Sequence, residues 1–300
     1  MELHDSKGLG LTSPSQKPIF VVEPTSTHSY SIILLHGLSS KGESFGTELL
    51  ETGVTSTGKK LPQLLPGARW IFPTAKRRRS TTFGRAMLTQ WFDVVRLPDP
   101  EYRRETQLQG LSESVLEIRE LIHQEMSKVP PEHIIIGGLS QGCAMSLSVL
   151  LSLEHRLGGF IGMSGYLPFK SDIEYAVETT EMDGDDPFAT GDGDSNDEPA
   201  DPEVKAMVFE RDLLCLDPLP HPTRETTASR TPVFLGHGNM DEKKPVKQGE
   251  AAARAMRAAG YKVQWKSYAD LGHWYKIPDE IDDIVNFIQC EIGWLCENDK

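Results

Sequence analysis

The chain has 300 residues, of which 38% are hydrophobic, so it can bury the core of one large α/β domain. Its formal net charge of −13 argues against nucleic-acid binding, because such proteins normally present a basic face. No apolar run is long enough to span a bilayer, and the polar N-terminal residues do not resemble a secretory signal, so we expect peripheral membrane contact at most. Four cysteines without C-x-x-C spacing predict reduced thiols in the cytoplasm or the nucleus and no metal site.

The first half of the chain alternates predicted strands and helices behind a polar tail. Residues 1–17 are expected to form a flexible tail. The nearly continuous apolar run at 31–35 is typical of a central strand that is covered on both faces. Apolar residues at helical spacing predict a helix over 108–128. The other predicted elements are an edge strand at 18–23, a weak helix at 42–52 and a strand at 70–73.

Two short motifs between these elements admit more than one interpretation. The basic run 76–79 could be a nuclear address or a patch for anionic lipid, but its four residues in an acidic chain favour a solvated loop. The motif at 90–93 reads Gln-Trp-Phe-Asp, and two adjacent aromatic residues are usually part of a core.

The stretch 134–142 has the pattern of a nucleophile elbow. A short apolar strand leads into G-x-S-x-G at 138–142, and a helix is predicted from Gln141 to about residue 154. This turn would expose the hydroxyl of Ser140, and the first amides of the helix would point at a developing oxyanion. A Gly-Ser turn in an ordinary loop is the alternative. The flanking strand and helix favour the elbow.

The second half continues the alternation of strands and helices. The predicted elements are strands at 157–164, 231–237 and 263–268 and helices at 245–260 and 278–294. Strands that alternate with helices predict an α/β-hydrolase fold with a mostly parallel central sheet and helices on both faces. We expect one such domain over 18–296.

An insertion is predicted within this domain at 170–230. Its acidic, glycine-rich part at 181–203 cannot bury enough surface to order itself, so we expect it to be disordered and dispensable for folding. A calcium loop there is disfavoured, because Asp192, Asp194 and Asn196 lack the required glycine and glutamate in register. Residues 204–219 regain hydrophobicity and could form a short helix near the site mouth or a packed connector.

A serine nucleophile needs a histidine base, and the histidine needs a carboxylate that fixes its tautomer. Asp241 and His273 each follow a predicted strand, in the chain order Ser, Asp, His of α/β-hydrolases. They are therefore the predicted partners of Ser140. His36 and His237 also end strands, and we interpret them as structural or loop-shaping residues.

Six motifs in order resemble the acyl-protein thioesterase/lysophospholipase family, also called the phospholipase/carboxylesterase family. They are His-Gly-Leu at 36–38, Gln-Trp-Phe-Asp at 90–93, the elbow at 137–142, Ser-Gly-Tyr-Leu-Pro at 164–168, His-Gly with Asp241 and Pro245 after 237, and Gly-His at 272–273. The resemblance implies a serine hydrolase of carboxylic thioesters or esters with Ser140, Asp241 and His273 as its triad and with no metal or cofactor. It also implies that the backbone amides of Leu38 and Gln141 form the oxyanion hole, and that Trp91 lies close to the active site as a candidate substrate-binding residue.

Several positions depart from the family pattern, and they concern the walls of the acyl site. Leu139 stands before the serine where the family usually has Phe, and Cys143 follows the Gln-Gly pair where the family usually has Gly. Residues 242–244 read Glu-Lys-Lys where the family is more apolar. Trp274 follows the predicted base as a second substrate-binding candidate. It could form an aromatic wall of the site, or it could pack beneath the closing helix with Ile277 and Ile281.

The partner implied by the resemblance is an acylated protein or a small acyl ester. Three functions remain open at this point: an acyl-protein thioesterase, a general carboxylesterase or lysophospholipase for small esters, and an inactive hydrolase that serves as a binding module. The intact Ser140, Asp241 and His273 count against the last of these. The oligomeric state is not predicted.

Overall fold

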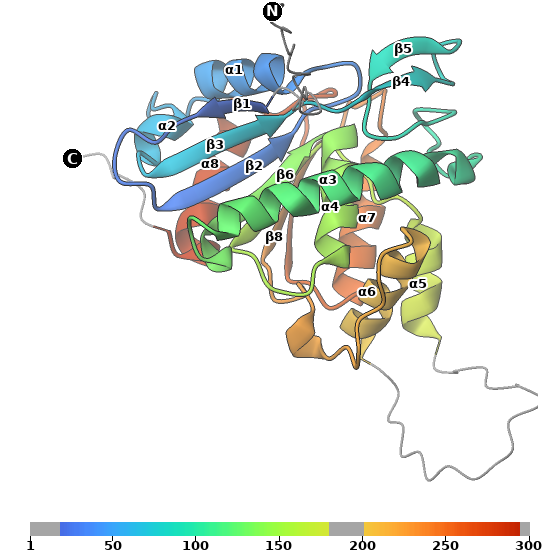
Figure 1. The fold of residues 1–300 in the computed structure, drawn as a ribbon. Coiled ribbons are helices and arrows are strands. Elements are labelled where there is room, and N and C mark those ends of the chain that lie inside the picture. Colours follow the sequence, from blue (N-terminus) through green and yellow to red (C-terminus); the bar gives the residue numbers. More distant parts are fainter. Residues whose placement is uncertain (1–18, 180–200, 295–300) are drawn as a thin grey trace, which may run out of the picture.

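The computed structural model describes residues 19–179 and 201–294 (Figure 1). Its strands are β1 (Ile19–Val22), β2 (Tyr30–Leu35), β3 (Ala68–Pro73), β4 (Arg77–Ser80), β5 (Ala86–Thr89), β6 (Ile134–Leu139), β7 (Gly159–Met163), β8 (Val233–Gly238) and β9 (Val263–Tyr268). Its α-helices are α1 (Gly42–Thr52), α2 (Leu61–Leu64), α3 (Leu108–Met126), α4 (Gln141–Ser152), α5 (Lys170–Glu178), α6 (Pro202–Leu213), α7 (Val246–Ala258) and α8 (Asp279–Phe287).

Seven strands form one sheet in the order β1-β3-β2-β6-β7-β8-β9. The edge strand β1 runs antiparallel to β3, and every other neighbouring pair is parallel. This arrangement confirms the predicted α/β-hydrolase fold. The predicted closing helix continues beyond α8 as a π-helical turn at Ile288–Ile292.

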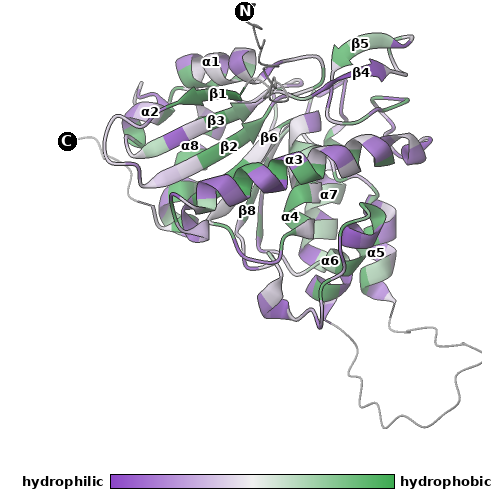
Figure 2. Cartoon of the chain, in the orientation of Figure 1, coloured by the Kyte–Doolittle hydropathy of each residue, from purple (hydrophilic) through white to green (hydrophobic). Residues whose placement is uncertain are grey.

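Side chains of the parallel strands alternate between two buried layers, as the pleat of a strand requires. Ile33 and Ile136 face the layer that contains α3, α4 and α7. Ile32 and Ile135 face the layer that contains α1 and α8. Hydrophobic and hydrophilic residues alternate along α3, which covers the sheet with one face, whereas every residue of α4 is buried (Figure 2). The core therefore lies on both sides of the central strands, and α4 is fixed at its centre.

The basic run 76–79 does not form a solvated loop, so that prediction is wrong. Residues from Arg77 onward form β4, which pairs antiparallel with β5 in a separate two-stranded sheet. Lys76 and Arg78 point to one side of this ribbon, and both form ion pairs with Glu113 of α3. Arg77 and Arg79 stay exposed. The alternation of side chains along a strand explains why only every second cation has an acidic partner.

The helix α6 is a packed connector and does not lie near the site mouth. Nη1 of Arg211 donates to the carbonyl oxygen of Ser152 at 2.9 Å, at the C-terminal end of α4. Ser140 lies at the opposite end of the same helix. Figure 1 shows α5 and α6 side by side at that distant end. The alternative that placed this segment at the mouth is therefore wrong.

Several predictions fall on residues outside the described ranges. These are the tail at 1–17, the calcium candidates and the acidic stretch up to residue 200. The last residues of the predicted acidic stretch are described, and Pro202 and Glu203 belong to α6. Glu203 is buried and pairs with Arg224 at 3.1 Å. The expected disorder is therefore wrong at this end, because a proline at the first position favours the start of a helix.

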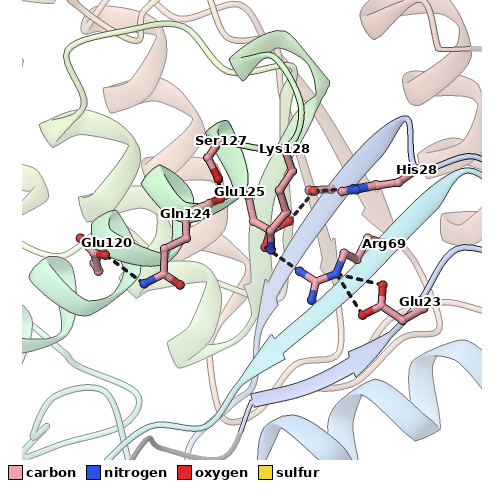
Figure 3. Close-up of polar contacts among 9 residues, drawn as sticks. Glu23, His28, Arg69, Glu120, Gln124, Glu125, Ser127 and Lys128 are labelled. Carbon is pink, nitrogen blue, oxygen red and sulfur yellow. Dashed lines mark hydrogen bonds and ion pairs between the residues drawn. The ribbon is translucent and has the colours of Figure 1, made fainter.

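A buried carboxylate fastens α3 to the N-terminal ends of β2 and β3 (Figure 3). Glu125 accepts hydrogen bonds from the Ser31 hydroxyl at 2.8 Å, from Nη1 of Arg69 at 2.5 Å and from Nζ of Lys128 at 2.6 Å. This cluster lies at the end of the sheet opposite to the carboxyl ends of the strands. None of the helices in the described ranges is long and apolar enough to cross a membrane.

Candidate active site

The predicted site residues meet at one edge of the sheet. Ser140 follows β6, Asp241 follows β8, and His273 follows β9, while Leu38 lies in the loop after β2. These strands are parallel, so their carboxyl ends share that edge, which is where open α/β sheets bind their ligands.

Ser140 occupies a sharp turn between β6 and α4. Its backbone has φ 56° and ψ −116°, a conformation that costs free energy in any residue other than glycine. The Ser140 amide donates to the carbonyl oxygen of Met163 at 2.8 Å, which holds the turn against β7. A Cβ atom at Gly142 would lie 2.0 Å from the Leu35 carbonyl oxygen, and one at Gly138 would lie 2.4 Å from it. The two glycines are therefore required by the close passage of β2.

Ser140, His273 and Asp241 form one hydrogen-bonded chain. Nε2 of His273 lies 2.8 Å from the Ser140 hydroxyl oxygen, and Nδ1 of His273 lies 2.7 Å from Oδ2 of Asp241. The Asp241 side chain is fully buried, and the His273 side chain is 15% exposed. This is the spacing that a serine nucleophile, its base and an orienting carboxylate require.

Asp241 keeps its negative charge because four donors surround it. Its Oδ1 accepts the backbone amides of Lys243 at 2.9 Å and Lys244 at 2.8 Å, and His237 and His273 approach Oδ2. Burial would raise the pKa of Asp241, but the hydrogen bonds from His237, His273 and the Lys244 amide outweigh it and hold the pKa well below its ordinary value. An ionised Asp241 fixes the tautomer of His273 with its proton on Nδ1.

The loop that carries Leu38 is held by a neutral histidine. Nδ1 of His36 donates to the Gly37 carbonyl oxygen at 2.7 Å, and Nε2 of His36 accepts the Ala75 amide at 3.0 Å. Burial lowers the pKa of His36 to about 4, although the hydrogen bond to Gly37 acts in the opposite direction. The N–H of a peptide unit points away from its C=O, so this contact turns the Leu38 amide away from His36. His36 therefore shapes the loop, as expected.

The side chain of Gln141 ties the start of α4 to the motif at 90–93, and Trp91 connects that motif to the loop of Leu38. Its Oε1 accepts the Trp91 amide at 3.0 Å, and its Nε2 donates to the Phe92 carbonyl oxygen at 2.7 Å. Nε1 of Trp91 in turn donates to the carbonyl oxygen of His36 at 2.8 Å. The backbone amides of Gln141 and Leu38 donate to no carbonyl among the loop and turn hydrogen bonds of the described residues. Both amides therefore remain available for an oxyanion.

Trp91 is not among the residues that line the cavity beside Ser140, so the structure does not support it as a substrate-binding residue. Its side chain is 1% exposed and belongs to the buried core. The two adjacent aromatic residues in the sequence had indicated this place in the core. Trp91 lies close to the site, as the resemblance implied, and it contacts the loop of Leu38 through the carbonyl oxygen of His36.

A cavity of about 230 Å³ opens beside the Ser140 hydroxyl. Its lining residues come mainly from the loops after β2, β5, β8 and β9 and are Gly37, Leu38, Ser39, Ser40, Phe45, Phe83, Leu97, Leu139, Ser140, Lys243, Lys244, His273 and Trp274. Phe83 reaches this site from the β4–β5 hairpin and is 49% exposed. The sequence did not indicate Phe45, Phe83 or Leu97, because helix α1, the β4–β5 hairpin and the loop after β5, which are distant in the chain, bring them together.

Trp274 combines both of the roles considered for it. It lines the cavity beside His273, and its ring stacks at a tilt on Tyr275 with 5.1 Å between centroids. It also packs against the buried cluster that contains Ile281. Ile277 is exposed and does not cover it. Within the described part of the chain, no group of three His, Cys, Asp or Glu side chains is placed to hold a metal ion.

Two protein-family models match this chain. The model of the phospholipase/carboxylesterase family matches residues 16–183. The model of the prolyl oligopeptidase family matches residues 102–294, which include Ser140, Asp241 and His273.

Curated relatives and solved structures agree with the first of these matches. The chain is 25% identical over 276 residues to acyl-protein thioesterase 1 of Gibberella zeae, covering 91% of this chain and 94% of that protein. It is 27% identical over 243 residues to carboxylesterase SOBER1 of Arabidopsis thaliana, covering 81% and 82%. The crystal structure of acyl-protein thioesterase 2 of Zea mays superposes with a TM-score of 0.63 at 26% identity, covering 93% of this chain and 100% of that one.

Proposed function

Because the chain belongs to the phospholipase/carboxylesterase family and is a hydrolase of carboxylic esters or thioesters, we propose that Ser140, His273 and Asp241 form its catalytic triad. The observation that carries this proposal is the unbroken chain of contacts, 2.8 Å from the Ser140 hydroxyl to His273 and 2.7 Å from His273 to Asp241.

In this proposal the reaction runs through an acyl-enzyme. The Ser140 hydroxyl attacks the acyl carbonyl carbon while Nε2 of His273 removes its proton, and Asp241 stabilises the resulting imidazolium. The amides of Leu38 and Gln141 donate to the oxyanion of the tetrahedral intermediate. His273 then gives its proton to the departing thiolate or alkoxide. Water, activated by the same base, hydrolyses the acyl-enzyme.

We propose S-acylated proteins as the substrates, with esters of small alcohols as the alternative. The relatives named acyl-protein thioesterase support the first class, and the relative named carboxylesterase supports the second. Phe45, Phe83, Leu97 and Trp274 give the cavity apolar walls that suit an acyl chain. The free thiols of Cys215 and Cys290 are exposed and fit a reducing compartment, so we propose a cytoplasmic or nuclear location.

A fluorophosphonate probe tests the triad directly, because it labels only an activated serine. We expect labelling of the wild-type protein and none of Ser140→Ala. Ser40→Ala is the matched control, since Ser40 lines the same cavity and, among the described residues, its hydroxyl has a hydrogen bond only to the Lys41 carbonyl oxygen at 3.5 Å. Labelling of Ser140→Ala would disprove the assignment, and absence of labelling in the wild type would indicate an inactive binding module.

A panel of substrates then separates the two substrate classes. The acyl-enzyme is the same for a thioester and an oxoester, so the leaving group and the acyl length must be varied independently. We expect higher kcat/KM for a long-chain thioester of a cysteine peptide than for the same acyl chain as an oxoester of the matching serine peptide, and higher kcat/KM than for a short-chain thioester of the same cysteine peptide. Equal values would favour the carboxylesterase alternative.

A further inference from the structure

A buried lysine forms part of the cavity wall beside the proposed triad. Lys244 lies three residues after Asp241, its residue is 3% exposed, and it lines the same cavity as Ser140 and His273. Lysine is almost never fully buried without a partner, because removing an ammonium from water costs free energy. Its position therefore needs an explanation that packing alone does not provide.

The Lys244 ammonium has no carboxylate partner among the described residues. Its Nζ donates to the Leu97 carbonyl oxygen at 2.5 Å and lies 4.1 Å from the centre of the Tyr166 ring. The acid that attracts the ammonium is Asp241, whose oxygens already accept two backbone amides and face two imidazoles. A carbonyl and an aromatic face stabilise a cation only in part, so the ammonium keeps donors for a further acceptor.

The surroundings leave the charge of Lys244 incompletely compensated. Burial lowers the pKa of its ammonium to about 7, and attraction to Asp241 only partly opposes this. An anion that entered the cavity would favour the charged form, because an opposite charge at close range stabilises an ammonium.

A second lysine stands at the same wall. Lys243 is exposed and also lines the cavity, so two successive cations border it in a chain whose formal net charge is −13. The other walls carry the aromatic rings of Phe45, Phe83 and Trp274. The cavity that contains the proposed nucleophile thus combines an apolar side with a cationic side.

We propose that the cavity selects esters or thioesters that carry an anionic group, a carboxylate or a phosphate, close to the bond that is cleaved, and that Lys244 is the residue that recognises it. This inference rests on the proposed function, because Lys244 would contact the anionic group of a substrate that is bound at Ser140. The anion can belong to the acyl group or to the leaving group, and the two sources share the same chemistry.

Two pairs of substrates distinguish these sources. For the acyl group, para-nitrophenyl hemiglutarate is compared with para-nitrophenyl methyl glutarate, which differs only in the masked carboxylate. For the leaving group, the butyrate ester of para-hydroxybenzoate is compared with that of para-hydroxybenzamide. The readout is the ratio of kcat/KM for the anionic substrate to kcat/KM for its neutral partner. We expect this ratio to exceed one in at least one pair for the wild-type protein.

Substitution at Lys244 should remove the preference. We expect Lys244→Met to lower the ratio about tenfold to a hundredfold, the usual range for a lost hydrogen bond to a buried charge. Lys243→Met should lower it less, because water screens an exposed cation. Lys247→Met is the matched control, since Lys247 is exposed on α7 outside the cavity lining, and its ratio should equal that of the wild type.

The inference is overturned if the wild-type protein prefers neither anionic substrate, or if Lys244→Met retains the wild-type ratios. Lys244→Gln provides the same test should the methionine variant fail to fold. Hydrolysis of the neutral partners keeps the proposed function intact in either case. Failure of the wild-type protein to cleave any of the four esters would instead count against the proposed function.

Discussion

Nε2 of His237 lies 3.2 Å from Oδ2 of Asp241, the same oxygen that faces His273 at 2.7 Å. Nε2 of His237 also lies 2.8 Å from the Lys244 carbonyl oxygen, an acceptor, so this nitrogen carries a proton. His237 therefore connects the carboxylate to the loop that follows it. We infer that it positions Asp241 for its contact with His273.

Removal of this donor should slow the reaction. We expect His237→Ala to lower kcat about tenfold with little change in KM, because a small misplacement of the carboxylate weakens its hold on His273. His237→Gln, which retains a donor, should recover part of the rate. A stability loss with an unchanged kcat would indicate a purely structural role.

The indole of Trp91 supports the oxyanion loop, which makes its hydrogen bond a second target. Trp91→Phe keeps most of the buried ring but leaves the His36 carbonyl oxygen without its donor, which should cost about 1–3 kcal/mol of stability. We also expect kcat to fall while KM stays similar, because the Leu38 amide stabilises the transition state more than the bound ester. Trp70→Phe is the control, since Trp70 is equally buried and its Nε1 has no partner among the described residues. Equal effects of the two variants on kcat would contradict the proposed support.

Trp274 forms a wall of the cavity next to His273, so its replacement should alter selectivity. We expect Trp274→Ser to change the ratio of kcat/KM between bulky and small leaving groups by about 1–3 kcal/mol, the usual range for a changed apolar pocket. The same variant should lose less stability than the roughly 3–5 kcal/mol of a fully buried tryptophan, because Trp274 is only partly buried. Two substrates and a melting temperature on one variant provide the test. A lower melting temperature with an unchanged kcat/KM ratio would contradict the role of Trp274 as a selective wall of the cavity.

Two buried glutamates should make the protein less stable in alkali. Burial raises the pKa of Glu280 to about 8, although the Lys276 amide lowers it, and burial likewise raises the pKa of Glu210 to about 8. The folded protein retains these protons where the unfolded chain has released them, so stability present below about pH 4.5 is lost as the pH rises through about 8. Glu280→Gln should therefore stabilise the protein at about pH 9 and change little at about pH 4. Urea denaturation at both values checks this, and an equal effect at both would contradict the raised pKa.

The sequence was sufficient for the sheet and for the order of the proposed triad. Continuous apolar runs indicated the central strands, and Ser140, Asp241 and His273 were found from their places after predicted strands. Such patterns are local, since each depends on residues next to one another in the chain.

Predictions that depended on contacts between distant segments were less successful. The basic run 76–79 could not be assigned to a ribbon without its partners, β5 and the acids of α3. The role of Trp91 depended on Gln141, fifty residues later, and on the carbonyl of His36. Periodicity predicts which face of a helix or strand is apolar, but it does not predict which residues that face contacts.

The cluster around Glu125 predicts a loss of stability that leaves catalysis intact. Glu125→Gln would weaken its contacts with Arg69 and Lys128 in a buried position, which should cost about 2–3 kcal/mol, the range for hydrogen bonds to charged groups. Burial acts to raise the pKa of Glu125, but Lys128, Ser31 and Arg69 outweigh it and lower that pKa, so this stabilisation should fade as the pH falls. Glu120→Gln is the control, because Glu120 is exposed and accepts only from Gln124 in Figure 3. Urea denaturation from neutral to acidic pH should show the Glu125→Gln curve approaching that of the wild type in acid, while kcat of the folded variant stays at the wild-type value. A constant difference between the curves would contradict the lowered pKa.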